Sequence, residues 1–143
     1  MTPAKQKTLL FCLLLFSIYC ALIIGQSWDE ETELLRGKIT LDYFFSLGEV
    51  DKAILYREYY SPIYWSLSYF LTKIFPSQFQ IEVGHVINLF FSFSVIFGIG
   101  KLGKELFNKK VGELCFLILF FYPIFFGHMA MNNKDTILAL SHI

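Results

Sequence analysis

Long runs of apolar residues that contain no charged side chain limit most strongly how this chain can fold. The runs cover residues 8–28, 83–100 and 114–133, and another begins at Thr136. A helix needs roughly 20 apolar residues to cross the hydrocarbon core of a bilayer. Only 17% of the 143 residues are charged, against about 25% in ordinary soluble domains. We therefore predict an all-α, multi-pass membrane helix bundle with its spans over these runs.

The first run has two interpretations, a retained membrane helix or a cleaved signal peptide. Lys5 and Lys7 precede it, as in a signal peptide, but no small-residue cleavage site follows, because the run ends in IIGQSW. A lipoprotein site needs a small residue before its cysteine, and here Tyr19 precedes Cys20. The three cysteines all lie in apolar runs, which argues against a disulfide framework. We favour the retained helix.

Lysine clusters indicate which side of the membrane each connection faces. Four lysines lie between Lys101 and Lys110, and two more precede the first run. Short cytoplasmic segments are rich in Lys and Arg, so both clusters should lie inside. Residues 26–82, between the first two spans, then form a long outer loop with nine acidic and five basic residues.

A shorter uncharged stretch within this outer loop, residues 59–72, has only 14 residues and is too short for an ordinary span. A crossing here would also place one lysine cluster outside. Aromatic side chains with a polar edge favour the headgroup level of a bilayer. They fall here in adjacent pairs: Tyr59 and Tyr60, Tyr64 and Trp65, and Tyr69 and Phe70. We predict that this stretch lies along the interface.

The outer loop opens with a helix-start pattern and a pair of acids. Ser27 followed by Glu30 is a capping-box spacing, which places Asp29 and Glu30 in the first turn of a juxtamembrane helix. Gly37 and Gly48 then suggest two short helices before the aromatic stretch. The acids have two readings. They either cap the helix and favour its dipole, or they act as a base or as metal ligands at the membrane surface.

The end of the third run carries an unusual group of polar side chains. If the run is helical, His128, Asn132 and Asp135 share one face, with Lys134 beside them and Pro123 able to open the backbone below. A histidine at a helix end is often only hydrated or hydrogen-bonded. Polar and ionisable groups near membrane depth are costly, however, and tend to mark functional sites.

The second run contains its own polar and small residues. His85 and Asn88 lie one turn apart, and hydrogen bonds between helices are the favoured explanation. Gly98, Gly100 and Gly103 near its inner end fit close helix packing or a helix stop. They do not form a nucleotide fingerprint, because no strand precedes them.

The order of these motifs resembles the amino-terminal part of the GT-C superfamily of membrane glycosyltransferases. The most similar group is the bacterial relatives of dolichyl-phosphate-mannose–protein mannosyltransferases. Many relatives have His-Pro-Pro where this chain has Tyr60-Ser61-Pro62. The segments that carry the resemblance are Trp28-Asp29-Glu30, Tyr60-Ser61-Pro62-Ile63-Tyr64-Trp65, Phe126-Gly127-His128 and Asn132-Asn133-Lys134-Asp135.

The resemblance implies a transferase in a bacterial inner membrane that uses a polyprenyl-phosphate-linked sugar at the outer surface. Residues 1–143 would be the amino-terminal part of such an enzyme, inactive alone, and the acceptor would be a protein, lipid or glycan. Asp29 would be the general base, assisted by Glu30. Donor-phosphate contacts would come from Arg57, His128, Asn132 and Lys134, and a divalent metal could bind near Asp135 together with Asp29 and His128.

Two other classes of protein stay open. A transporter or flippase fragment could line a path with His85, Asn88 and His128. A non-enzymatic membrane subunit would show no transfer reaction that depends on Asp29. The long acidic outer loop favours the transferase, since a transporter of this size would more often have short loops. The net charge of zero gives no support for nucleic-acid binding.

Overall fold

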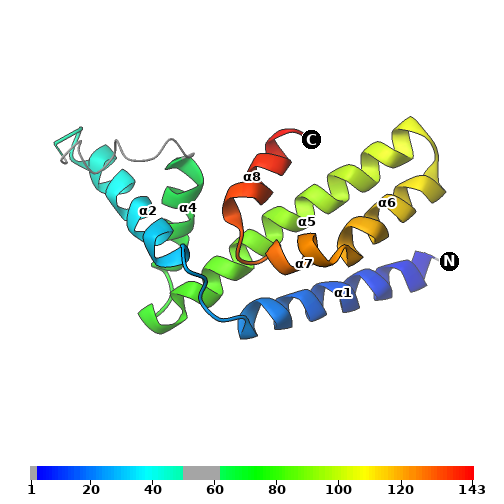
Figure 1. The fold of residues 1–143 in the computed structure, drawn as a ribbon, viewed down its shortest axis with the longest axis horizontal. Coiled ribbons are helices and arrows are strands. Elements are labelled where there is room, and N and C mark those ends of the chain that lie inside the picture. Colours follow the sequence, from blue (N-terminus) through cyan, green and yellow to red (C-terminus); the bar gives the residue numbers. More distant parts are fainter. Residues whose placement is uncertain (1–2, 50–61) are drawn as a thin grey trace.

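The computed structural model describes residues 3–49 and 62–143, with side chains from Ala4 onward. This part of the chain is helical and contains no strand, which confirms the all-α prediction. The helices are connected in the order shown in Figure 1. They are α1 (Pro3–Ile23), α2 (Glu30–Phe45), α4 (Pro62–Thr72), η1 (Ser77–Phe79), α5 (Gln80–Leu106), α6 (Lys109–Phe121), α7 (Pro123–His128) and α8 (Asn133–Ser141).

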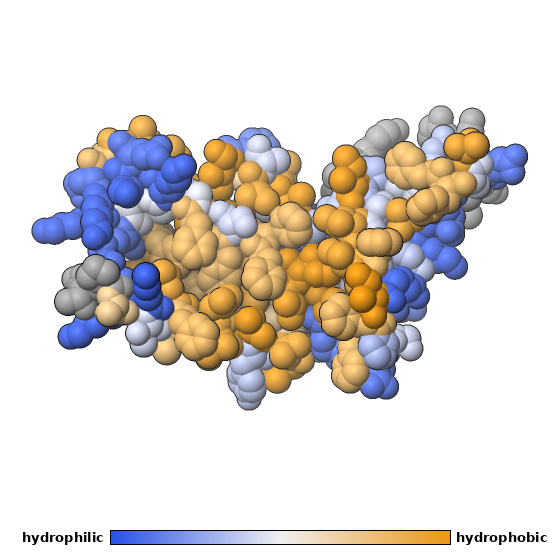
Figure 2. All heavy atoms as spheres, turned by 180° about the vertical axis from the view of Figure 1, so that it is seen from behind, coloured by the Kyte–Doolittle hydropathy of each residue, from blue (hydrophilic) through white to orange (hydrophobic). Residues whose placement is uncertain are grey.

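Among the described residues, two helices are long and apolar enough to cross a membrane. They cover Ala4–Ile23, which is most of α1, and Ser77–Leu106, which is η1 and α5. At 1.5 Å per residue, α5 alone is about 40 Å long and extends beyond the predicted span 83–100 at both ends. Hydrophobic side chains cover the middle of the face in Figure 2, and hydrophilic residues gather at both ends of the molecule.

The third apolar run is not one helix, so the prediction of a single helix over residues 114–133 is wrong. A crossing by this run stays a prediction. α6 ends at Phe121 and α7 begins at Pro123, with Tyr122 between them in an extended conformation (ψ 113°). Proline disfavours helical backbone in the residue before it and has no N–H to donate. A second break separates α7 from α8. The last helix begins at Asn133 and not at Thr136, because the Asn132 side chain accepts a hydrogen bond from the Asp135 N–H.

α5 is the central helix, and α1, α4, α6 and α8 all pack against it. Of the two explanations for the glycines near its carboxyl-terminal end, close packing or a helix stop, the structure supports close packing for Gly100 and Gly103. A Cβ added to Gly100 would lie 3.4 Å from the Gly112 carbonyl oxygen, and one on Gly103 would lie 3.1 Å from the Cys115 sulfur. Aromatic residues extend this α5–α6 contact: the Phe97 ring lies 5.3 Å from the Phe116 ring, and the Phe93 ring lies 6.0 Å from the Phe120 ring, centroid to centroid.

α2 and α4 pair at one end of the molecule, away from the α5–α6 turn (Figure 1). Their contact explains Gly37, because an added Cβ would overlap the backbone carbonyl of Trp65. The prediction that Gly37 separates two short helices is therefore wrong, since α2 runs through it. Gly48 does follow the helix end, with a φ of +97°. Residues 50–61, which include the first part of the aromatic stretch, lie outside the described part of the chain.

α4 has 11 residues and therefore extends about 16 Å, well short of a bilayer core. It lies within the stretch expected to follow the membrane interface. That placement and the number of crossings stay predictions.

Candidate functional site

The site forms where the start of α2 meets α5 and the start of α8. The capping box predicted for α2 is half formed: Glu30 Oε2 accepts a 2.7 Å hydrogen bond from the Ser27 N–H. Asp29 is the residue before the helix, yet its side chain makes no capping hydrogen bond. Glu30 therefore stabilises the start of the helix, and the Asp29 carboxylate faces outward, 60% exposed.

Glu30 is buried under this turn, where it meets α5. Its Oε1 lies 2.7 Å from His85 Nε2, and the His85 Nδ1 lies 2.9 Å from the carbonyl oxygen of Ala21 in α1. The two side chains are 8% and 2% exposed. This confirms the prediction that His85 makes hydrogen bonds between helices. One histidine thus ties α1, α2 and α5 together below Asp29.

Lys134 joins the start of α8 to the start of α2. Its Nζ lies 3.0 Å from Asp29 Oδ2 and 3.4 Å from Glu33 Oε1, although Asp29 and Lys134 are 105 residues apart in sequence. Partial burial alone would lower the pKa of Lys134. The hydrogen bond to Asp29 and the negative charge of Glu33 outweigh this effect and raise the pKa. The lysine is therefore a cation held between two carboxylates at the surface.

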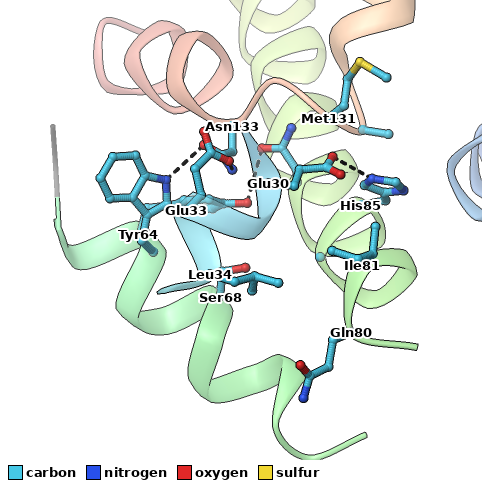
Figure 3. A pocket seen from close by; sticks show the side chains of 14 residues that line it. Glu30, Glu33, Leu34, Tyr64, Ser68, Gln80, Ile81, His85, Met131 and Asn133 are labelled. Carbon is cyan, nitrogen blue, oxygen red and sulfur yellow. Dashed lines mark hydrogen bonds and ion pairs between the residues drawn. The ribbon is translucent and has the colours of Figure 1, made fainter. Parts of the chain in front are cut away.

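Glu33 lies one turn after Asp29 on α2 and points inward. Its Oε2 accepts a short hydrogen bond from the Asn133 side-chain amide (Figure 3). Asn133 Oδ1 in turn accepts a 3.1 Å bond from Trp65 Nε1. Burial raises the pKa of Glu33, and the Asn133 bond and the Lys134 charge offset this only in part. The chain of contacts fixes α2, α4 and α8 to one another around the Asp29–Lys134 pair.

Asn88 forms the floor of this polar cluster. Its amide donates to the Met129 carbonyl oxygen at 3.0 Å, and its oxygen accepts from the Tyr64 and Thr136 hydroxyls at 3.3 and 2.9 Å. Ser92 donates to the same Met129 carbonyl at 2.8 Å. This carbonyl lies at the break between α7 and α8, where two side chains of α5 donate hydrogen bonds to it. The prediction that Asn88 bonds between helices is confirmed.

The predicted line of His128, Asn132 and Asp135 along one helix face is wrong, because the chain turns between α7 and α8. The three side chains are still neighbours. The Asn132 amide lies 3.3 Å from His128 Nδ1 and 2.8 Å from Asp135 Oδ2. Within residues 3–49 and 62–143, no group of three or more His, Cys, Asp or Glu could hold a metal ion. The described residues therefore provide no set of ligands for the metal expected at Asp135.

A cavity of about 30 Å³ lies behind the surface pair, lined by residues that include Glu30, Glu33, His85 and Asn88. A water molecule needs roughly 10–15 Å³ of such volume, so the cavity has room for about two waters and is too small for a sugar. Figure 3 shows Glu30 directed at His85 and Glu33 beside Asn133 on its walls. Within this site, only the exposed side of the Asp29–Lys134 pair is therefore open to a molecule larger than water.

The structure brings together some of the predicted site residues and not others. Asp29 and Lys134 are in contact, and Glu30 lies behind them; Arg57 falls outside the described residues. The sequence patterns did not identify Glu33 and Asn133 as site residues. For Glu33 one indication was present, because residues four apart on a helix lie on the same face and Glu33 follows Asp29 by four. Protein-family models, curated proteins and solved structures give no match to this chain.

Proposed function

We propose that the chain is part of a membrane glycosyltransferase that takes its sugar from a polyprenyl phosphate at the outer surface of a bacterial cell membrane. The observation that carries this proposal is the Asp29–Lys134 pair. An exposed carboxylate and a cation, 3.0 Å apart, come from distant parts of the sequence to one surface. Two helices of membrane length support a membrane location. The resemblance of the motifs to GT-C enzymes supplies the reaction class.

The reaction needs one base and one anion-binding group. Asp29 accepts the proton of the acceptor hydroxyl as its oxygen bonds to the anomeric carbon of the sugar. The bond from that carbon to the phosphate oxygen breaks, and polyprenyl phosphate leaves with the electron pair. Lys134 lies where its ammonium group can stabilise the negative charge on the leaving phosphate. The sugar is transferred, and no oxidant, reductant or metal is required for the balance.

Glu30 has a different role from the one expected. Both of its carboxylate oxygens are engaged, one by the Ser27 N–H and the other by His85, and the side chain is buried. We therefore assign Glu30 and His85 as positioning residues, which hold the turn that carries Asp29. They do not contact substrate.

The transporter alternative draws no support from the polar groups within the helices. His85 and Asn88 bond to protein partners, and the cavity beside them has room for only about two waters.

The test of the proposal is Asp29→Asn in an active full-length protein with a polyprenyl-phosphate-linked sugar as donor. The amide keeps the shape of the side chain and removes the base, so we expect transfer to fall by about 10²–10⁴-fold at normal abundance in the membrane. Glu31→Gln is the matched control, because Glu31 is an exposed neighbouring acid, and it should retain nearly all activity. Near-normal transfer by Asp29→Asn would overturn the assignment.

A further inference from the structure

An open groove lies at the end of the molecule opposite the Asp29–Lys134 pair. α1 and α6 both flank α5 here, and Figure 1 shows the amino-terminal end of α1 beside the α5–α6 turn. The hollow between the three helices has a volume of about 480 Å³. Ligand pockets in proteins have about 300–1,000 Å³, so this groove has the size of a binding site, unlike the cavity at the other end.

The walls of the groove are apolar along most of its length. Leu9 and Leu10 of α1 form one side, and Phe97 of α5 and Phe116 of α6 form the other. The last two rings contact each other, with centroids 5.3 Å apart. The residues lie within or beside the two membrane-length helices, so a hydrocarbon chain is the ligand chemistry that matches these walls.

The inner rim of the groove is positively charged. Lys101, Lys104 and Lys109 line it together with one acid, Glu113. Glu113 is already engaged, because Gln6 donates a 2.7 Å hydrogen bond to it and Lys109 lies 3.8 Å away. Lys104 makes no ion pair with any residue in the part of the chain that the structure describes. Lys101 lies 3.9 Å from the exposed Glu105, which does not line the groove. Counted against Glu105 and Glu113, the three lysines leave one net positive charge at the rim, and Lys104 is the lysine available to an anion.

We propose that this groove binds one anionic phospholipid of the inner leaflet. An acyl chain would lie against the apolar walls, and the phosphate would contact Lys101, Lys104 and Lys109. The combination of an apolar groove and a cationic rim fits a lipid that has both parts, whereas a free phosphate would leave the walls uncovered. The proposal rests on the lysine-rich turn facing the cytoplasm, where anionic lipids gather, and is independent of the transfer reaction.

The test uses the 143-residue chain in vesicles made of equal parts of phosphatidylcholine and phosphatidylglycerol. The protein is released in mild detergent, and bound lipids are counted by native mass spectrometry. We expect one phosphatidylglycerol per chain, retained in preference to phosphatidylcholine. Each lysine near an anionic surface contributes roughly a fivefold change in binding, so Lys104→Gln should lower retention by about that factor.

Two further variants make the test specific. Lys110→Gln removes a lysine of the same turn that does not line the groove, and it should leave retention unchanged. Leu9→Trp places a bulky ring in the groove and should lower retention while every lysine remains. Circular dichroism confirms that each variant keeps its helix content.

Three outcomes would overturn the proposal. They are equal retention of the two lipids, an equal effect of Lys104→Gln and Lys110→Gln, and a lipid-free dimer, which would assign the groove to a second copy of the chain. No sugar donor is present, so the result is separate from the Asp29 assay. If either the lipid-binding proposal or the glycosyltransferase proposal fails its test, the other is unaffected.

Discussion

Replacement of His85 by phenylalanine tests how far the buried Glu30 carboxyl depends on its imidazole partner. The carbonyl oxygen of Ala21 can only accept, so His85 Nδ1 must carry a hydrogen for its 2.9 Å bond. The 2.7 Å contact between His85 Nε2 and Glu30 Oε1 then needs one more hydrogen, on the imidazole or on the carboxyl. Phenylalanine can neither donate nor accept the hydrogen bond that this hydrogen makes between the two side chains.

The size of the loss separates an ionic pair from an ordinary hydrogen bond. Removal of one partner from a buried ion pair costs about 3–5 kcal/mol, whereas single hydrogen bonds between membrane helices average about 0.6 kcal/mol. The Glu30 side chain is only 8% exposed, and the phenylalanine ring fills the volume that a replacing water would need. We therefore expect His85→Phe to lower the free energy of unfolding by about 3 kcal/mol or more.

Glu30→Gln provides the matched contrast. The glutamine amide can donate to His85 Nε2 of a neutral ring, and its oxygen can still accept from the Ser27 N–H. Every polar atom then keeps a partner, so the loss should stay below about 1.5 kcal/mol. The assay is denaturant unfolding in detergent, followed by circular dichroism, with His142→Phe as an exposed histidine control. A loss under about 1 kcal/mol for His85→Phe, or equal losses for the two variants, would refute the reasoning.

Three further predictions concern packing, pH and topology. Gly37→Ala should destabilise the chain by about 1–3 kcal/mol because its Cβ meets the backbone of α4, whereas Gly84→Ala, in open space, should stabilise it by about 0.5–1 kcal/mol; thermal unfolding measures both. Burial raises the pKa of Glu33 above 4.5, so binding of a proton to this carboxyl favours the folded state. This contribution to the free energy of unfolding is complete below pH 4.5 and is lost as the pH rises through the folded-state pKa. Wild type should therefore gain stability over Glu33→Gln on acidification from neutral pH, and an unchanged difference would contradict this. Cysteines placed at Ser46 and Asn108 should be labelled from outside only at Ser46, and the reverse pattern would invert the topology.

Local patterns in the sequence predicted those parts of the fold that depend on neighbouring residues. The Ser27–Glu30 spacing predicted the hydrogen bond between these two residues, because a capping box involves only one turn of backbone. It placed Asp29 inside the first turn, whereas α2 begins one residue later, at Glu30. His85 and Asn88 were read correctly as partners between helices, because buried polar groups must be satisfied. Their partners could not be named, since these lie on helices that are distant in sequence.

The failures have the same physical origin. The third run is apolar on both sides of Pro123, so hydropathy alone cannot show that this proline divides it into α6 and α7. Glycine often marks the end of a helix, so Gly37 suggested a break. Its actual role is to let α2 approach the backbone of α4, and the sequence around Gly37 does not predict that contact. Glu33 was overlooked because its importance depends on Asn133 and Lys134, both about 100 residues further along the chain.

The separation of Asp29 and Lys134 also sets the order in which this surface is built during synthesis. Ribosomes add about 5–20 residues per second, so the 105 residues between the two take roughly 5–20 s to make. During that interval the start of α2 presents Asp29, Glu30 and Glu33 without the lysine that later lies between two of them. The acidic turn is therefore complete in sequence long before Lys134 is made, and during those seconds Asp29 and Glu33 lack the cation that later pairs with both.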